Sequence, residues 1–322
     1  MPQLSPSQRY EIEVLKRLKY GVSKISEHTG IPKSTVSREL KRNSQGGKYE
    51  AARAVKLASK RRQRGAYKLK GDLLERVEAD LAKKDSPEQI SGRLKQEGQP
   101  GVSHEAIYLL VYKDRKAGGE LFKNLRFGRR KRRKRLGRLS NRGKIPNKTM
   151  IDERPKVVDE KSRFGDYEGD TVIGGQHQGV LVTLVERKSK LTLTAKAPDK
   201  SADAVQKVVV DLLKNSPIPV TSLTFDNGTE FANHLEIAQL IGAPIYFAHP
   251  YHSWERGLNE NTNGLIRQFI PKKQNIHEVP DETILTIQNN LNNRPRKLLG
   301  FLSPIEFFNT AAVKGSSVAF ET

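Results

Sequence analysis

The sequence of 322 residues contains no cysteine, only two methionines and a single tryptophan. Without cysteine, neither a disulfide framework nor a thiolate-bound metal site can form. No run of 18 apolar residues occurs, which argues against a membrane-spanning helix. The first 18 residues are polar with a helical pattern, so they lack the apolar segment of a signal peptide. We therefore expect a folded protein that works in the cytosol.

Acidic residues are scarce in the first half of the chain, and the net charge of the whole protein is +22. Residues 1–150 hold 39 Lys and Arg against 15 Asp and Glu, whereas residues 151–322 hold 19 against 21. A basic half joined to a nearly neutral half indicates a module that binds a polyanion, attached to a different module. An anionic membrane surface is the weaker alternative, because no basic helix with a bulky apolar face occurs.

Residues 1–47 have the helical pattern of a helix-turn-helix domain. A helix over residues 7–19 is followed by "SKISEHTG" and then by "IPKSTVSRELKRN". Two short helices joined through a glycine-containing turn are typical of this motif. Its small core would be formed by Ile25, Ile31, Val36 and Leu40. The outward face of the last helix could reach base edges and phosphates of DNA through Lys33, Ser34, Thr35, Arg38 and Arg42.

Residues 71–124 predict a second three-helix unit, which follows a basic helix or linker over residues 48–70. Ser86-Pro87-Glu88-Gln89 has the composition of a capping box, and Ser103 precedes a further helix. For this second unit, binding of another DNA segment and a purely architectural role are both open.

Residues 125–160 are predicted to be a basic linker. They contain "RRKRRKR", seven basic residues in succession, which cannot fold alone because like charges repel and nothing apolar is available to bury. We expect the run to bind the phosphate backbone without sequence preference. The residues proposed for these contacts are Arg129, Arg130, Lys131, Arg132 and Arg133.

From about residue 160 the pattern changes to short strands that alternate with helices. The predicted order over residues 161–322 is β-β-β-α-β-α-β-α, with further helices near residues 281–291 and 303–309. This order indicates an α/β layer architecture and is shared by the ribonuclease-H-like fold. The predicted fold class is therefore multidomain, with N-terminal all-α helix-turn-helix units followed by an α/β ribonuclease-H-like core.

Carboxylates in this second half could form a metal site. Asp170 lies in the first predicted strand and Asp226 closes the fourth, and these strands are neighbours in a ribonuclease-H-like sheet. Two carboxylates so close are costly without a cation between them, and Mg²⁺ or Mn²⁺ prefers oxygen ligands. Asp166 and Glu168 compete with Asp170, because strand alternation puts all three on one face. Asp226 could instead cap an Asn-Gly turn.

Two glutamates stand in the segment "SWERGLNENTNGLIRQF", which has a helical pattern. At about 100° per residue, Glu260 shares a face with Arg256, Asn263 and Arg267, and this polar stripe suits a site for metal and phosphate. Glu260 is therefore the better candidate for a third ligand, and Arg256 and Arg267 could contact phosphates. Glu255 is expected in the first turn, where the helix dipole stabilises it. An ion pair with Arg256 is the alternative for Glu260.

Five segments of the chain are similar to one family of proteins. "STVSRELKRN", "EGDTVIG", "TFDNGTEF", "HPYHSWERGLNENTNGLIRQFIPK" and "LNNRPRKLLGFLSPIEFF" together resemble the transposases of the IS-thirty family of bacterial insertion sequences. The resemblance runs through nearly the whole chain. It implies a catalytic Asp-Asp-Glu triad with 33 residues between the last two members, which falls on Asp170, Asp226 and Glu260.

The resemblance also implies an integrase-like core that cuts and joins double-stranded DNA with two divalent ions, Mg²⁺ or Mn²⁺, held by the triad. The N-terminal units would bind the terminal inverted repeats of the element. The active complex with these repeats and the target DNA would be a homo-oligomer, associated with the nucleoid in the bacterial cytoplasm. Two alternatives remain, a DNA-binding regulator with an unused core and a nuclease that depends on a divalent metal.

Overall fold

The computed structural model describes residues 4–66, 69–126, 145–175, 178–250, 252, 255 and 257–318. The chain divides into two compact units, Met1–Arg76 and Val77–Thr322. In the part of the chain that is described, no helix is both long enough and apolar enough to span a bilayer. Outside it lie six of the predicted phosphate contacts: Arg129, Arg130, Lys131, Arg132, Arg133 and Arg256.

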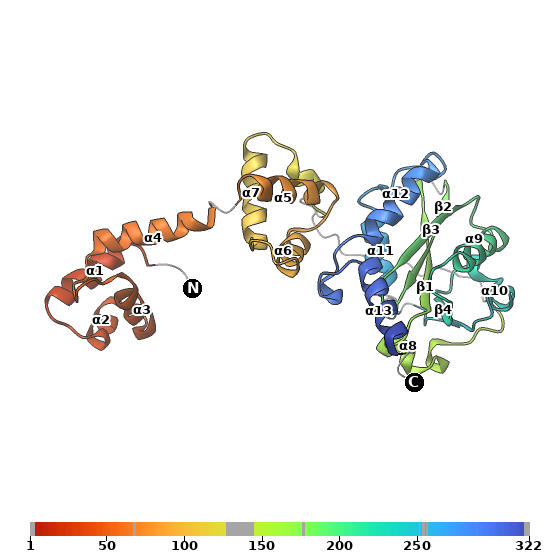
Figure 1. Ribbon diagram of the computed structural model, residues 1–322, viewed down its shortest axis with the longest axis horizontal. Helices are drawn as coiled ribbons and strands as arrows, with labels where there is room; N and C mark the ends of the chain where they lie inside the picture. Colours follow the sequence, from red (N-terminus) through yellow and green to blue (C-terminus); the bar gives the residue numbers. More distant parts are fainter. Residues whose placement is uncertain are drawn as a thin grey trace. The chain divides into compact units, whose positions relative to one another are not determined.

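The first unit consists of four helices (Figure 1). The first helix begins with a capping box, in which the Ser5 hydroxyl accepts from Gln8 N and the Gln8 side chain accepts from Ser5 N. The second helix ends at Gly30, whose φ of +68° is a left-handed conformation that glycine adopts without strain. The helices are α1 (Pro6–Arg17), α2 (Val22–Thr29), α3 (Lys33–Asn43) and α4 (Ala51–Ala66).

The core of this unit forms as the helical spacing predicts. Ile25, Ile31 and Val36 are buried, and Leu40 packs against them partly buried. Apolar contacts between α2 and α3 therefore fix the turn between these two helices, which leaves the opposite face of α3 exposed.

Three further helices begin the second unit or lead into it. Ser86 and Gln89 form the predicted capping box, with Ser86 Oγ accepting from Gln89 N over 3.3 Å. Ser103 Oγ accepts from Ala106 N over 3.3 Å, so the predicted helix start at Ser103 is confirmed as well. The helices are α5 (Asp72–Ala82), α6 (Pro87–Gln96) and α7 (His104–Lys116).

A five-stranded mixed sheet forms the centre of the second unit, in the order β3-β2-β1-β4-β5. β1 pairs antiparallel with β2 and parallel with β4, so the first and fourth strands are neighbours, as the sequence predicts. This order and these directions are those of the ribonuclease-H-like fold. The strands are β1 (Asp166–Ile173), β2 (Val180–Glu186), β3 (Thr192–Ala197), β4 (Ser222–Phe225) and β5 (Ile245–Phe247).

Helices cover both faces of the sheet, with α9 and α10 on one side and α11 and α12 on the other (Figure 1). The helices of this unit after α7 are α8 (Lys156–Glu160), α9 (Ala202–Lys214), α10 (His234–Ile241), α11 (Gly257–Ile266), α12 (Asp281–Asn292) and α13 (Pro304–Val318). α11 is shorter than the pattern predicts. Glu255 therefore precedes this helix rather than lying in its first turn, and Arg267 follows its end.

The coverage on two faces explains the composition of the central strand β2. Val182 and Leu184 join the apolar core under α9, whereas Leu181 joins the core formed with Leu265 of α11 and Ile284 of α12. Alternate side chains of a strand point to opposite faces, so a strand covered on both sides is apolar at nearly every position.

Candidate active site

Asp170 and Asp226 stand at the same edge of the sheet. β1 and β4 run parallel, with Glu168 opposite Thr224. Two residues further along each strand, Asp170 comes level with Asp226, which directly follows β4. Neighbouring strands are about 4.8 Å apart, so the two carboxylates extend from adjacent backbones toward the side of α11.

Gly169 allows β1 to approach an aromatic ring directly beside this edge. A Cβ atom at Gly169 would lie 2.4 Å from Cε1 of Phe225, which real Cβ atoms do not tolerate. The Phe225 ring in turn stacks on Phe231, with 4.0 Å between ring centroids. The glycine before Asp170 is therefore required because buried aromatic rings occupy the space of its side chain.

Hydrogen bonds orient both carboxylates. Asp170 Oδ1 accepts from Thr171 N and Asp170 Oδ2 accepts from Asn263 Nδ2, each over 2.8 Å. Asp226 Oδ1 accepts from Gly228 N over 2.8 Å, which is the turn-capping contact that the Asn-Gly sequence predicts as an alternative role. This capping contact also fixes the direction of the Asp226 side chain.

The contact between Asn263 and Asp170 positions α11, which packs on β1 and β2. Glu260 lies three residues before Asn263, so it stands about 60° round the helix and about 4.5 Å along its axis. Its side chain is exposed. The hydrogen bond therefore brings the side of α11 that carries Glu260 to the middle of β1.

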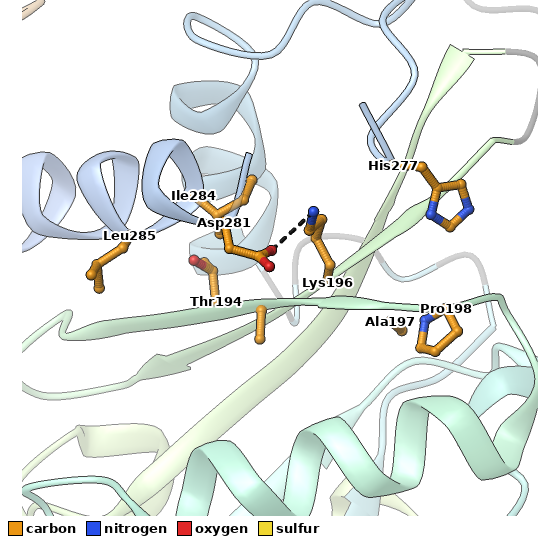
Figure 2. A pocket seen from close by; sticks show the side chains of 9 residues that line it. Thr194, Lys196, Ala197, Pro198, His277, Asp281, Ile284 and Leu285 are labelled. Atoms are coloured by element: carbon orange, nitrogen blue, oxygen red, sulfur yellow. Dashed lines mark ion pairs between the residues drawn. The ribbon is translucent and has the colours of Figure 1, made fainter. Parts of the chain in front are cut away.

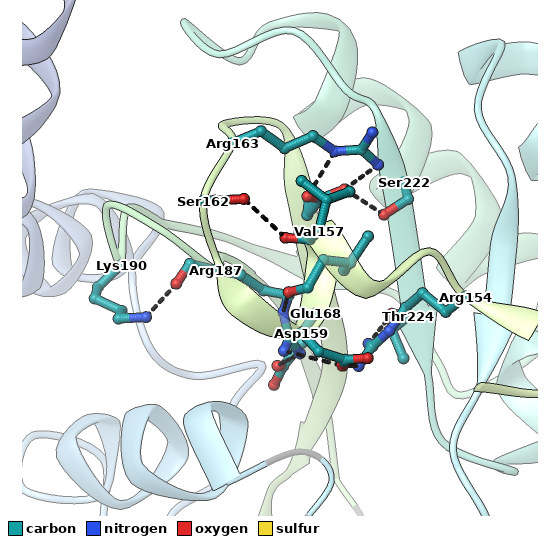
Figure 3. A network of polar contacts seen from close by, with 12 residues as sticks. Arg154, Val157, Asp159, Ser162, Arg163, Glu168, Arg187, Lys190, Ser222 and Thr224 are labelled. Carbon is teal, nitrogen blue, oxygen red and sulfur yellow. Dashed lines mark hydrogen bonds and ion pairs between the residues drawn. The ribbon is translucent and has the colours of Figure 1, made fainter. Parts of the chain in front are cut away.

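The two competing carboxylates of β1 are engaged in a buried polar network (Figure 3). Asp166 accepts from Nε and Nη2 of Arg163, each over 3.0 Å, and from Ser222 Oγ over 2.6 Å. Glu168 is buried and forms an ion pair with Arg187, which is buried as well. Asp166 and Glu168 thus have structural partners on the same strand face, whereas Asp170 is half-buried beyond the last residue of β1 that pairs with β4.

The same network lies beside a cavity of about 780 Å³ near the start of α11. Burial lowers the pKa of Arg187, and it lowers the pKa of Lys190 to about 8. Four carboxylates in the lining offset most of the charge of its basic side chains, so the cavity has no strong preference for an anion. The acidic residues of the lining are Asp152, Asp159, Glu168 and Glu255. The basic residues of the lining are Arg154, Lys156, Lys161, Arg187 and Lys190.

A second cavity, of about 490 Å³, lies between the end of β3 and the start of α12 (Figure 2). Lys196 Nζ donates to the Val279 carbonyl over 2.8 Å and pairs with Asp281 Oδ1 at 2.9 Å. None of the residues that line this cavity belongs to the predicted site. The cavity therefore has no part in the predicted carboxylate site.

Glu230 is a further carboxylate near this edge that the sequence pattern did not single out. Its side chain is 4% exposed, its Oε1 accepts from Thr171 Oγ1 over 2.8 Å, and its Oε2 lies 3.2 Å from Lys200 Nζ. It thereby supports the residue next to Asp170. Its place in "DNGTEF", directly after the Asp226 turn, is the signal that could have identified it.

The predicted DNA contacts are placed on two different elements. On α3, Thr35 is half-buried and the exposed residues are Lys33, Ser34, Arg38 and Arg42. Arg267 follows α11, and its Nη2 donates to the Ile173 carbonyl over 2.6 Å. Burial lowers its pKa. This contact ties Arg267 to the end of β1, and a phosphate contact by the same side chain stays a prediction.

The donor types of the three predicted residues suit a divalent cation that prefers oxygen, although their carboxylate oxygens do not all come within 4.8 Å of one another in this structure. Asp170, Asp226 and Glu260 offer carboxylate oxygens only, from the middle of β1, from the residue after β4 and from α11. Hydrogen bonds already hold the first two in place, so little side-chain freedom would be lost on binding. Carboxylates select Mg²⁺ or Mn²⁺ by chemistry rather than softer metals.

Comparison with known proteins agrees with this architecture. The sequence model of a helix-turn-helix domain family matches residues 2–43. The transposase for insertion sequence element IS4351 of Bacteroides fragilis is 44% identical, over 98% of this chain and 98% of its own. The transposase for IS1086 of Cupriavidus metallidurans is 36% identical over 94% and 93%. Transposase InsI for IS30A of Escherichia coli is 36% identical over 94% and 82%.

Among solved structures, the catalytic core domain of BIV integrase aligns with 47% of this chain and 97% of that domain. The sequence identity is 18% and the TM-score is 0.36. The sheet order and strand directions described above establish the fold without this alignment.

Proposed function

Because the chain belongs to the IS-thirty (IS30) family of insertion-sequence transposases, we propose that it cuts and joins DNA at Asp170, Asp226 and Glu260. The protein is a DNA transposase with a helix-turn-helix domain and an integrase-like core. The observation that carries the assignment of the site is the hydrogen bond from Asn263 to Asp170. It joins the helix of Glu260 to the sheet edge where Asp170 and Asp226 stand side by side.

The reaction at this site would consist of two successive phosphodiester substitutions. Water attacks the phosphorus at the end of the element, and the P–O3′ bond breaks to release a 3′-hydroxyl. That hydroxyl then attacks a phosphorus of the target DNA, where a new P–O bond forms and the target's own 3′-oxygen leaves as a hydroxyl. When bound, two divalent ions such as Mg²⁺ would lower the pKa of the attacking water or hydroxyl and stabilise the leaving oxygen. Asp170, Asp226 and Glu260 would hold these ions. No separate base and no covalent enzyme intermediate is then required.

Residues around the triad have supporting roles in this proposal. Asn263 fixes the rotamer of Asp170, and Asn227 holds the turn after Asp226 by donating to the Ala248 carbonyl over 2.6 Å. Lys148 Nζ donates to Asn227 Oδ1 over 2.5 Å, so a third element joins the same turn. These contacts keep the carboxylates in place before DNA arrives.

DNA recognition is assigned to the N-terminal unit. The exposed face of α3, with Arg38 and Arg42, would enter the major groove of the terminal inverted repeats. The run of basic residues 129–135 would add phosphate contacts without sequence preference. Because an element has two ends that must be joined to one target, we expect the active complex to be a homo-oligomer.

A strand-transfer assay tests the catalytic assignment. The substrate is a supercoiled plasmid with abutted inverted repeats, incubated with Mg²⁺ and the full-length protein. Glu260→Gln should reduce strand transfer by at least about a thousandfold, because a metal ligand is lost. The matched control is Glu282→Gln on α12, an exposed position outside the site, which should leave the rate unchanged. Undiminished activity of Glu260→Gln would overturn the assignment.

The same assay separates the two alternative functions. A nuclease without end recognition would cleave equally well after the inverted repeats are scrambled, whereas a transposase would lose activity. A DNA-binding regulator with an unused core would bind the repeats tightly and show no strand transfer in the unmodified protein.

A further inference from the structure

Two histidines and a glutamate converge in the segment that joins β5 to α11. Glu255 Oε1 lies 3.0 Å from His249 Nδ1 and 3.0 Å from His252 Nδ1. One ligand atom from each of the three residues can be chosen so that all lie within 4.8 Å of one another. None of the three belongs to the carboxylate triad. We propose that this cluster is a second metal site, selective for Zn²⁺.

The donor types determine the metal. Two imidazole nitrogens with one carboxylate oxygen form a set that zinc accepts, with a water molecule completing four-coordination. Imidazole favours zinc over Mg²⁺, whereas the three carboxylates of the triad favour Mg²⁺ or Mn²⁺. The two sites would therefore hold different ions in the same solution. Since the chain has no cysteine, no thiolate competes for the zinc.

A partner outside the cluster orients one of its ligands. His249 Nε2 lies 2.9 Å from Asp152 Oδ2, on the side of the ring away from Glu255. A proton on Nε2 shared with this carboxylate leaves the Nδ1 lone pair directed toward Glu255, where the ion would lie. Ligating histidines commonly donate their other ring N–H to a carboxylate in this way, which fixes the tautomer and raises the basicity of the ligand.

Solvent can reach the cluster, so metal can enter and a coordination position can stay open. The side chains of His249 and His252 are 30% and 42% exposed, and that of Glu255 is 17% exposed. A hydrogen-bonded cluster without metal is the competing interpretation, because each Nδ1–H could donate to Glu255 Oε1. Both interpretations use the same contacts, and direct measurement of zinc separates them.

The location gives the site a consequence for the fold. His249 lies two residues beyond β5, and Glu255 lies two residues before α11. A zinc ion would therefore link the segment after β5 to the segment before α11. Glu260 lies five residues beyond Glu255, so a bound zinc ion would also restrict the motion of the third carboxylate of the triad. That last consequence rests on the proposed function, whereas the binding of zinc does not.

The experiment measures zinc binding on the full-length Glu260→Gln protein, produced without a polyhistidine tag. Metal is stripped with a chelator, and Zn²⁺ is titrated against a chromogenic competitor in an excess of Mg²⁺, which occupies carboxylate sites. We expect one Zn²⁺ per chain and a higher melting temperature with zinc than without it. Because this protein lacks one triad carboxylate, the result does not depend on the proposed catalytic function.

Substitutions in the cluster identify the ligands. His252→Ala and Glu255→Gln should each weaken zinc binding by about a hundredfold, and Asp152→Asn by about tenfold, because it only orients a ligand. Glu255→Gln keeps the shape of the side chain, so it still tests the site if the His252→Ala protein fails to fold. The matched control is His277→Ala, an exposed histidine elsewhere in the same unit, which should bind zinc as the parent does.

Cobalt offers an independent readout of coordination. Co²⁺ bound by this cluster should give visible absorption bands of a four- or five-coordinate ion, and His252→Ala should abolish them. The proposal is overturned if the parent protein binds no stoichiometric zinc. It is equally overturned if Glu255→Gln and His252→Ala, still folded by circular dichroism, bind zinc as tightly as the His277→Ala control.

Discussion

Asn263 Nδ2 donates to Asp170 Oδ2 over 2.8 Å, and this bond links α11 to the middle of β1. The two residues are 93 positions apart in the sequence, so only the folded chain brings them together. Thr183 Oγ1 of the neighbouring strand lies 3.3 Å from Asn263 Oδ1, and Thr183 Oγ1 also lies 3.2 Å from the Asp170 carbonyl. Asn263 thus holds the Asp170 carboxylate in position, and this role does not require Asn263 to contact DNA.

Replacing Asn263 should weaken the site without removing a ligand. Asn263→Ala is expected to lower strand transfer by about 10- to 100-fold and to raise the Mg²⁺ concentration needed for half-maximal rate, because the orientation of Asp170 is lost. The measurement is the strand-transfer rate over a Mg²⁺ titration. Asn289→Ala, at an exposed position on α12, is the control. An unchanged Mg²⁺ dependence in Asn263→Ala would contradict a positioning role.

Loss of charge should affect stability at Glu168 and activity at Asp170. Glu168→Gln removes the buried ion-pair partner of the Arg187 guanidinium and leaves it only the exposed Asp159 carboxylate at 3.8 Å, so we expect the free energy of unfolding to fall by about 3 kcal/mol. Asp170→Asn is half-buried and should change it by less than about 1 kcal/mol while abolishing strand transfer. Urea unfolding followed by circular dichroism measures both. Equal destabilisation by the two variants would be inconsistent with a structural role for Glu168 alone.

The contact between α6 and α13 should make stability depend on pH in the acid range. Arg93 Nη1 and Nη2 each donate to the Glu306 carboxylate over 2.6 Å, and this pair lowers the pKa of Glu306 to about 2. A lowered folded-state pKa means that the stabilisation is present above the unfolded value of 4.5 and is lost as pH falls toward 2. Glu306→Gln should flatten the pH dependence of urea unfolding in this range. Glu282→Gln, which has an exposed position on α12, should retain it.

The contribution of Asp85 to folding stability should depend on pH with the opposite sign. Burial raises its pKa to about 6, although Arg294 Nε lies 3.5 Å from Asp85 Oδ1. A raised folded-state pKa means that the contribution is fully present below the unfolded value of 3.8 and is lost as pH rises through 6. Asp85→Asn should therefore remove a decline in melting temperature between pH 4 and 6. If that decline persists in Asp85→Asn, another group is responsible.

Arg38 tests whether the exposed face of α3 reads DNA sequence. Arg38→Ala should weaken binding to the terminal inverted repeat by about 1–3 kcal/mol and leave binding to random DNA much less affected. Lys16→Ala on α1 removes the same charge from an exposed position outside α3 and serves as control. Fluorescence anisotropy with both DNAs at one salt concentration gives the ratio of the affinity for the inverted repeat to the affinity for random DNA. Equal losses on the two DNAs would assign Arg38 to a phosphate.

Local patterns were sufficient for much of the architecture. The helix starts at Ser86 and Ser103, the buried positions of the helix-turn-helix domain and the succession of strands and helices along the chain could be predicted from neighbouring residues. Capping and hydrophobic periodicity act within a few residues, so the sequence contains them directly. The contact of the Arg267 side chain with the Ile173 carbonyl could not be predicted in this way, because the two residues are 94 positions apart in the sequence.

What the sequence by itself determined is the division into a basic recognition half and a near-neutral α/β half, together with the three carboxylates at a recognisable spacing. Only the tertiary structure decided which carboxylates have other partners. Strand alternation puts Asp166, Glu168 and Asp170 on one face with equal standing, and the buried guanidinium of Arg187 then engages Glu168 from another strand end. The same holds for His249, His252 and Glu255, whose convergence depends on how the chain turns between β5 and α11. Side-chain partners across the fold are set by packing in three dimensions, which periodicity along one chain cannot specify.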